Sequence, residues 1–401
     1  MRPDHANIMM YSHDTFGLGH LRRSRAIAHA IVERVKRSNV MIMSGSSIAG
    51  AFDFRARVDF IKIPSVIKLY NGDYTSIAEH IDLRDTLRMR RAIVQSTAEI
   101  YRPDIFIVDK EPLGLRGELE PTLHFLKQTG CRLVLGLREV LDGPDLLRQE
   151  WARSDGLHHV DELYDEIWVY GCRHFWDPLS GLDVPASVRR RMRYMGYLRR
   201  AEPQSPSQVL NELPERYLLV TAGGGGDGVP MMHQVLAARE IDPDFEVDIV
   251  MVLGPFMKAE EREQIKDRAR YIDRMTIIDF DAKVETLMTN ATAIVSMGGY
   301  NTFCEILSFD KPALLVPRKH PRREQQVRAQ RAAELGVVDI IDSDAANDPI
   351  AMAGAIRAVL ARPRPSECAM PLDLDGLERV GDSVERYLAE LGIGKPALEP
   401  A

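Results

Sequence analysis

Short apolar runs recur along the chain and are separated by stretches with helix-like patterning. The first half contains the runs NIMMYS, NVMIMS, DIFIVD, RLVLGL and EIWVY, and the second half contains RYLLVTA, VDIVMVL, RMTIID, TAIVS and PALLVP. Continuous apolar character predicts strands that are covered on both faces, and strands that alternate with helices predict parallel sheets. We therefore expect an α/β fold with two doubly wound, Rossmann-like domains.

The composition changes between the two sets of strands. Residues 198–216, LRRAEPQSPSQVLNELPER, are rich in proline, serine and charged residues, which is typical of a linker. We place the boundary near Pro203, so that residues 1–202 form an N-terminal domain and residues 203–375 form a C-terminal domain.

The C-terminal segment, residues 376–401, has a different pattern. Its apolar residues recur at helical spacing from Leu377 to Leu391. This spacing predicts an amphipathic helix that closes the chain.

Composition narrows the class of protein. A length of 401 residues is sufficient for two domains with separate cores. The 52 basic and 59 acidic residues give a net charge of −7, which argues against a dedicated nucleic-acid-binding protein. The four cysteines lie far apart, without metal-ligand spacing or a disulfide framework.

These features, and the lack of a signal peptide or a membrane-spanning run, predict a cytoplasmic protein. Two basic segments that also contain apolar residues, 87–94 and 188–200, leave open a peripheral contact with the inner face of a membrane.

The most informative motif follows the expected strand TAIVS. Gly298 and Gly299 allow close approach to the backbone, and Asn301 and Thr302 come at a predicted helix start. Amide groups at a helix N-terminus, together with the helix dipole, form a phosphate site. Glu305 shares a helix face with Asn301 and could accept hydrogen bonds from a ribose diol.

This motif and the residues after it resemble family 28 of the glycosyltransferases with two Rossmann-like domains, the GT-B fold. The family pattern is G-x-N-[ST]-x-x-E, then a proline-flanked strand, then an acid-Gln pair. It is present here as Gly299 to Glu305, PALLVP, and Glu324-Gln325. The family includes the N-acetylglucosaminyltransferase of peptidoglycan synthesis.

The resemblance carries several implications. Glu305 would bind the ribose, and Glu324 and Gln325 would bind hydroxyl groups of the donor sugar. The two domains would face a central cleft, with the N-terminal domain on the acceptor side. The C-terminal helix would cross back onto the N-terminal domain.

A second glycine-rich turn, AGGGGDG, follows the first strand of the C-terminal domain. A dinucleotide fingerprint would need an acidic residue at the end of the next strand, and a P-loop would need Gly-Lys-Ser/Thr; neither is present. In glycosyltransferase families with the GT-B fold, the turn at this position approaches the donor diphosphate. By resemblance, Gly223, Gly224 and Gly225 take that role.

The sequence Asp279-Phe280-Asp281 matches the D-x-D metal motif of other glycosyltransferases. Residues 242–244 and 373–375 match it equally well, so the pattern carries little information and we expect no bound metal. By resemblance, the backbone of the loop that contains Phe280 meets the nucleobase.

The segment FGLGHLRRS follows the first expected strand and resembles the glycine-rich loop of the same family. Gly17 and Gly19 open space for a substrate, and His20 comes at the start of a helix. The positive end of a helix dipole favours a neutral imidazole, which can accept a proton from a hydroxyl group. His20 is therefore the candidate general base. Asp14 and Asp109, each just after an expected strand, are the alternatives.

The family resemblance, together with these residues, implies an inverting glycosyltransferase that moves a sugar from a nucleoside diphosphate sugar, which we expect to be a UDP-sugar, to a hydroxyl acceptor. The donor is a co-substrate, and we expect no other cofactor. The acceptor would be lipid-linked or a polysaccharide, in cell-envelope or polysaccharide biosynthesis.

Two alternatives stay open. A nucleotide-sugar hydrolase of the same superfamily would activate water, and a non-catalytic nucleotide-sugar-binding protein would have no use for His20. A nucleotide-sugar 2-epimerase is disfavoured because the opening turn lacks the pattern of that family.

Overall fold

The computed structural model describes residues 5–13, 19–68, 74–77, 80–203, 205–224 and 226–393. The chain divides into two compact units. The first comprises Met1–Leu198 and Asp375–Ala401, and the second comprises Arg199–Leu374. The division falls at Arg199 and not at the proline-rich stretch near Pro203, because Arg200 already bonds to the second unit through its backbone.

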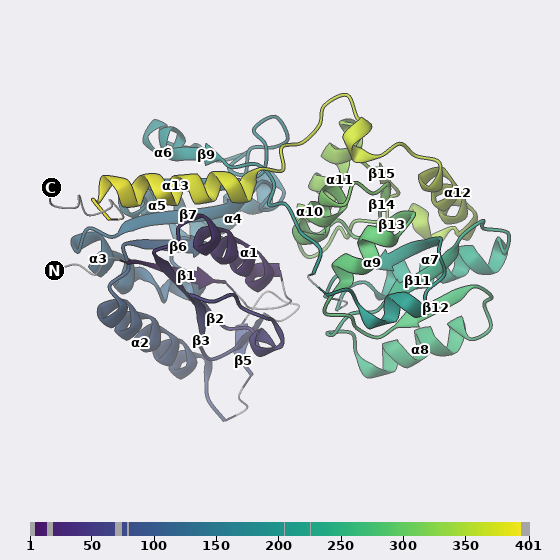
Figure 1. The fold of residues 1–401 in the computed structure, drawn as a ribbon, viewed down its shortest axis with the longest axis horizontal. Helices are drawn as coiled ribbons and strands as arrows, with labels where there is room; N and C mark the ends of the chain where they lie inside the picture. The colour runs from purple at the N-terminus through teal and green to yellow at the C-terminus, as the bar shows by residue number, and fades with distance from the viewer. Residues whose placement is uncertain are drawn as a thin grey trace, which may run out of the picture. The chain divides into compact units, whose positions relative to one another are not determined.

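The first unit contains a seven-stranded parallel sheet with the strand order β3-β2-β1-β6-β7-β8-β9 (Figure 1). A separate antiparallel pair, β4 and β5, lies outside it. The strands are β1 (Ala6–Ser12), β2 (Ser38–Ser44), β3 (Val58–Lys62), β4 (Val66–Lys68), β5 (Tyr74–Ser76), β6 (Ile105–Asp109), β7 (Arg132–Arg138), β8 (Glu166–Tyr170) and β9 (Met192–Tyr194).

The helices of this unit follow the strands in α/β order. They are α1 (Gly19–Arg34), α2 (Leu83–Tyr101), α3 (Glu120–Gln128), α4 (Pro144–Ser154), α5 (Gly156–Leu163), α6 (Ala186–Arg191) and α13 (Gly376–Glu390), with short 3-10 turns at Ala49–Ala51 and Leu115–Gly117. Strands β6 and β8 are buried at every position, as their continuous apolar runs predict.

The helix expected from the C-terminal pattern is α13. It belongs to the first unit and lies beside α1 (Figure 1). Its first residue, Gly376, approaches the backbone of the chain before the unit boundary: a Cβ there would lie 2.7 Å from the carbonyl oxygens of Gly196 and Tyr197. Glycine therefore permits this close entry of α13.

The second unit contains a six-stranded parallel sheet with the order β12-β11-β10-β13-β14-β15. The strands are β10 (Tyr217–Thr221), β11 (Asp248–Val252), β12 (Met275–Ile278), β13 (Ala293–Ser296), β14 (Ala313–Leu315) and β15 (Asp339–Ile340). The helices are α7 (Val229–Ile241), α8 (Ala259–Ala269), α9 (Val284–Asn290), α10 (Tyr300–Ser308), α11 (Glu324–Glu334) and α12 (Pro349–Leu360), with 3-10 turns at Gln208–Glu212, Ala345–Asn347 and Pro365–Glu367.

Each sheet has one point where the strand order reverses. In the first unit this point lies between β1 and β6, and in the second it lies between β10 and β13. The prediction of two doubly wound α/β domains is thus confirmed. Ligands of such sheets bind beside the carboxyl ends of the strands at the reversal. The residues after these four strands are therefore candidates for a ligand-binding site.

Candidate functional site

His20 and Asp109 meet at the reversal point of the first sheet. His20 lies in the first turn of α1, and Asp109 is the last residue of β6. The Nδ1 atom of His20 is 2.5 Å from Oδ2 of Asp109. A carboxylate accepts a hydrogen bond, so Nδ1 carries the proton and Nε2 is left as the basic nitrogen. Asp109 is therefore placed as a partner of His20.

Arg23 binds the same carboxylate. Its Nε and Nη2 atoms lie 3.0 and 2.6 Å from Oδ1 of Asp109, and Nη2 lies 2.7 Å from Oδ2. The Arg23 side chain is buried. Burial alone would raise the pKa of Asp109, but the charge of Arg23 and the hydrogen bonds from His20 and Arg23 hold this pKa well below its usual range. Asp109 is consequently a carboxylate.

The imidazole of His20 is neutral near pH 7. The pKa of His20 is lowered from 6.5 to about 4. Burial is the largest cause, the carboxylate of Asp109 opposes it, and the charges of Arg23 and Arg138 act in the same direction as burial. The sequence predicts a neutral ring from the helix dipole. In the structure, desolvation is the largest cause.

A second histidine lies beside His20. His13 directly follows β1 and is 2% exposed. Its ring meets that of His20 edge to face, with 5.7 Å between the centroids. Among the residues that the structure describes, no hydrogen-bond partner is found for its buried Nδ1. Burial holds the pKa of His13 well below its usual value, so both rings are neutral.

Tyr170, the last residue of β8, lies over Gly136 of the neighbouring strand β7. A Cβ at Gly136 would lie 2.5 Å from the Tyr170 hydroxyl, so the tyrosine ring needs a glycine at this position of β7. Gly136 is itself paired with Asp109 of β6. Tyr170 was not predicted from the sequence. Arg23 stands in the pattern G-x-G-H-x-x-R, and its spacing of three residues from His20 was the signal for a contact that was not predicted.

In the second unit, α10 begins directly after the β13 turn. Gly298 has a φ of 73°, and Gly299 caps α10 without a side-chain hydrogen bond to the first turn. Asn301 and Thr302 lie in this first turn, each 8% exposed. The positive end of the helix dipole at this turn favours a bound anion.

Arg200 reaches the same helix terminus from the segment between the units' two sheets. Its Nη2 atom donates to Oδ1 of Asn301 at 2.7 Å, and its backbone N–H donates to the Ser308 hydroxyl at 2.9 Å. A cation beside the positive end of a helix is electrostatically unfavourable, unless an anion binds between them. From the sequence, Arg200 was predicted only as part of a basic segment, residues 188–200.

The turn after β10 lies beside α10. A Cβ on Gly223, whose φ is 69°, would be 3.7 Å from the Thr302 hydroxyl. Gly254, after β11, has a φ of 97°, and a Cβ there would lie 2.8 Å from the carbonyl oxygens of Gly223 and Gly224. The three turns after β11, β10 and β13 are therefore packed in sequence along one edge of the sheet. Gly254 was not predicted from the sequence.

Glu305 lies one turn after Asn301 in α10 and is 1% exposed. A carboxylate at this depth has to be hydrogen-bonded to stay charged. The role in ribose binding that the family resemblance implies for it stays a prediction.

Glu324 and Gln325 begin α11, after β14. Arg318 contacts both: its Nη2 lies 3.3 Å from Oε1 of Glu324, and its backbone N–H lies 3.3 Å from Oε1 of Gln325. The Nη1 atom of Arg318 bonds to Asp227, in the turn after β10. The sequence predicted a role for the pair in α11 but not for Arg318 or Asp227.

The two aspartates around Phe280 have protein partners. Asp279 pairs with Lys266 at 2.8 Å, and Asp281 accepts hydrogen bonds from the Ser207 hydroxyl and from the backbone N–H of Lys283. Within the described ranges, no group of three or more His, Cys, Asp or Glu residues is arranged to hold a metal. Phe280 is 42% exposed, and the contact of its loop with a nucleobase stays a prediction.

Three predicted residues, Asp14, Gly17 and Gly225, lie outside the described residues. Gly19 is the first residue of α1.

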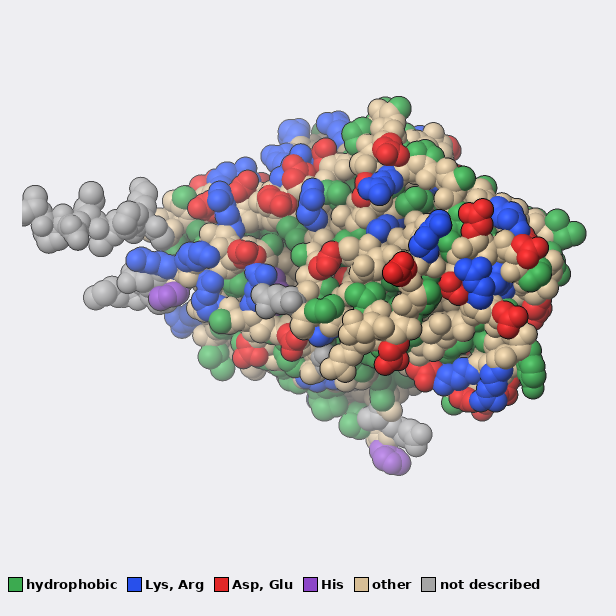
Figure 2. Space-filling view, turned by 45° about the vertical axis from the view of Figure 1, so that its right-hand side comes forward, with side chains coloured by type: hydrophobic (Ala, Val, Ile, Leu, Met, Phe, Trp, Pro, Cys, Tyr) green, Lys and Arg blue, Asp and Glu red, His purple; other side chains and the backbone are tan. Residues whose placement is uncertain are grey.

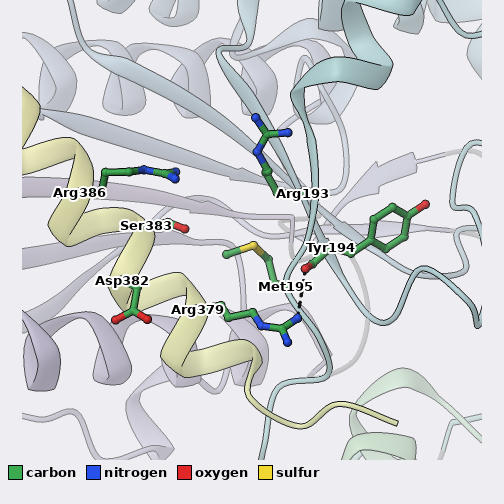
Figure 3. Close-up of a pocket in the computed structure, with 7 residues that line it drawn as sticks. All are labelled: Arg193, Tyr194, Met195, Arg379, Asp382, Ser383 and Arg386. Atoms are coloured by element: carbon green, nitrogen blue, oxygen red, sulfur yellow. Dashed lines mark hydrogen bonds between the residues drawn. The ribbon is translucent and has the colours of Figure 1, made fainter. Parts of the chain in front are cut away.

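A separate pocket of about 270 Å³ lies in the first unit, between β9 and α13 (Figure 3). It is lined by Arg193, Tyr194, Met195, Arg379, Asp382, Ser383 and Arg386. Its arginines already have partners: Arg379 pairs with Asp375 at 2.8 Å and Arg386 lies 3.4 Å from Glu166. None of the lining residues follows β1 or β6, so we do not assign this pocket to the His20 site.

The surface carries both signs of charge. Figure 2 shows Lys and Arg side chains interspersed with Asp and Glu over the face drawn, which agrees with the small net charge. Of the helices in the described part of the chain, none combines the length and the apolar character needed to span a bilayer.

Comparison with known proteins agrees with the motifs. Residues 218–364 match the glycosyltransferase family 28 C-terminal domain. The chain is 26% identical over 127 residues to a UDP-N-acetylglucosamine–N-acetylmuramyl-(pentapeptide) pyrophosphoryl-undecaprenol N-acetylglucosamine transferase of Leuconostoc citreum (strain KM20), which covers 30% of this chain and 34% of that protein. The chain thus spans little more than a third of the length of the curated relatives it matches.

Solved structures resemble the whole chain. CalG4, the calicheamicin glycosyltransferase, has a TM-score of 0.59 at 15% identity, with 100% of both chains covered. A UDP-N-acetylglucosamine 2-epimerase has a TM-score of 0.64 at 16% identity, with 99% of this chain and 98% of that chain covered. The predicted GT-B fold is thus confirmed. Because transferases and epimerases share it, the fold does not decide the reaction.

Proposed function

We propose that the chain, whose second unit carries a glycosyltransferase family 28 C-terminal domain, is a glycosyltransferase that moves a sugar from a UDP-sugar to a hydroxyl acceptor with inversion. The observation that carries this proposal is the pairing of a neutral His20 with the Asp109 carboxylate at the reversal point of the first sheet. A carboxylate on Nδ1 leaves Nε2 as the proton acceptor and stabilises the imidazolium that forms.

In the proposed donor complex, the diphosphate binds the first turn of α10. The amide groups after Gly299 and the guanidinium of Arg200 supply positive charge there. The turn at Gly223 and Gly224 borders the same position. Glu305 would bind the ribose, and the loop of Phe280 would meet the base.

In the proposed reaction, the acceptor oxygen gives its proton to Nε2 of His20 and attacks the anomeric carbon. The bond from that carbon to the diphosphate oxygen breaks, and the electron pair leaves with UDP. The helix terminus and Arg200 stabilise the charge that develops on the diphosphate, and the proposal needs no metal for this step. It requires that both sites act on one donor and acceptor pair.

For the acceptor, we propose a lipid-linked or polysaccharide hydroxyl. The support is the similarity to the Leuconostoc enzyme, whose name gives an undecaprenol-linked substrate. A cytoplasmic location with peripheral contact at the inner face of the membrane would suit a lipid-linked acceptor.

Product analysis tests the proposal. The protein is incubated with UDP-N-acetylglucosamine or UDP-glucose, together with a lipid extract or a soluble polysaccharide fraction, and the products are identified by mass spectrometry. A new glycoside supports sugar transfer. Free sugar in every mixture would indicate a hydrolase, and binding without turnover would indicate a non-catalytic binding protein.

A further inference from the structure

Arg318 connects two turns that are not neighbours in the sheet. Asp227 lies in the turn after β10, and Arg318 follows β14. In the strand order, β13 lies between β10 and β14. The ion pair between Arg318 and Asp227 therefore joins the turns that follow the strands on either side of β13.

The same arginine orients the first two residues of α11. Its guanidinium lies 3.3 Å from the carboxylate of Glu324, and its backbone N–H donates to the side-chain oxygen of Gln325. Because the oxygen of the Gln325 amide accepts from Arg318, its NH₂ group points away from that N–H. Glu324 is then an oriented acceptor beside an oriented donor.

Burial separates this arrangement from an ordinary surface ion pair. Glu324 and Gln325 are each 7% exposed, and the side chains of Arg318 and Asp227 are 27% and 39% exposed. The guanidinium of Arg318 thus contacts two carboxylates, the half-exposed one of Asp227 and the nearly buried one of Glu324. Such shared charge-assisted hydrogen bonds fix geometry more than they add stability.

We propose that Arg318, held by Asp227, is a positioning residue for the sugar part of the donor. It presents the Glu324 carboxylate as an acceptor and the Gln325 amide as a donor to two hydroxyl groups of the sugar, and it leaves binding of the nucleotide to α10 and the β10 turn. This inference rests on the proposed function, because it assumes a nucleotide-sugar donor.

Calorimetry with UDP, UDP-N-acetylglucosamine and UDP-glucose tests the inference. In Arg318→Met, affinity for UDP should stay within about twofold of the wild-type value, while affinity for the preferred UDP-sugar should fall by about 10-fold and the preference between the two sugars should be lost. Asp227→Asn keeps a hydrogen-bond acceptor for Arg318, so its effect should be smaller and in the same direction.

Lys319→Met is the matched control. Lys319 is the next residue, its side chain is also 27% exposed, and it also bridges two carboxylates, those of Asp342 and Asp344. Its variant should bind all three ligands like the wild type, and melting temperatures of both variants check the fold.

Three results would overturn the inference. Arg318→Met could lower affinity for UDP and UDP-sugars equally, which would show a structural role, or it could change neither. A wild-type protein that binds neither UDP nor either UDP-sugar would remove the proposed function as well, and so the two failures are distinguishable.

Discussion

At the scale of single residues, the pairing of His20 with Asp109 makes a prediction about pH. A general base is active when it is unprotonated, and the pKa of His20 is lowered to about 4. We expect kcat/KM to hold its plateau as the pH falls through 6.5 and to decline only as the pH approaches 4. A profile that declines around pH 6.5, in protein whose circular dichroism is unchanged, would contradict the burial of this ring.

The same shift has a consequence for stability. The folded-state pKa of His20 lies below the ordinary value of 6.5, so the unfolded chain binds the proton more readily. The contribution of this residue to the free energy of unfolding is therefore complete above pH 6.5 and is lost as the pH falls toward 4.

At the scale of elements, the contact between the β11 and β10 turns depends on Gly254. Gly254→Ala should lower the free energy of unfolding by about 1 to 3 kcal/mol, because alanine is strained at positive φ and its Cβ would clash with the carbonyl oxygens of Gly223 and Gly224. It should also weaken UDP binding. Urea unfolding and calorimetry measure the two effects.

Gly354→Ala in α12 is the control for this substitution. A Cβ at Gly354 meets nothing within 4 Å, and alanine is the better helix former by about 1 kcal/mol. If Gly254→Ala and Gly354→Ala had the same free energy of unfolding, the result would contradict the close approach of the β11 and β10 turns.

At the scale of the whole molecule, the first unit is built from both ends of the chain. Tyr387 of α13 stacks nearly parallel to Trp168 of β8, with centroids 6.5 Å apart, and the guanidinium of Arg132 lies 4.6 Å from its ring. Trp168 and Arg132 of the N-terminal part of this unit therefore pack against α13, from the other end of the chain.

Tyr387→Ala tests this closure. Tyr387 is 2% exposed, so its loss should lower the free energy of unfolding by about 3 kcal/mol, measured by thermal unfolding, without changing UDP affinity. Tyr271→Ala, at a side chain that is 91% exposed, should change stability by less than about 0.5 kcal/mol. Equal effects of the two changes would argue against a stabilising role for α13.

The sequence predicts local features of this molecule better than long-range ones. Buried strands are readable because continuous apolar runs are local, and His20 stands out because it begins a helix after a glycine-rich loop. The bond from His20 to Asp109 joins residues 89 positions apart, so the pattern could name both but could not pair them. Arg318 was missed for the same reason: its partner Asp227 is 91 positions away.

The central claim is that His20 is the general base. His20→Ala should reduce kcat by about 10² to 10⁴-fold, measured as UDP release with the acceptor found by product analysis, while UDP affinity stays within about twofold of the wild type. Asp109→Asn should also reduce kcat. His29→Ala, on the same helix α1, should turn over normally. Normal turnover of His20→Ala, with loss of activity in an Asp14 variant, would contradict the assignment.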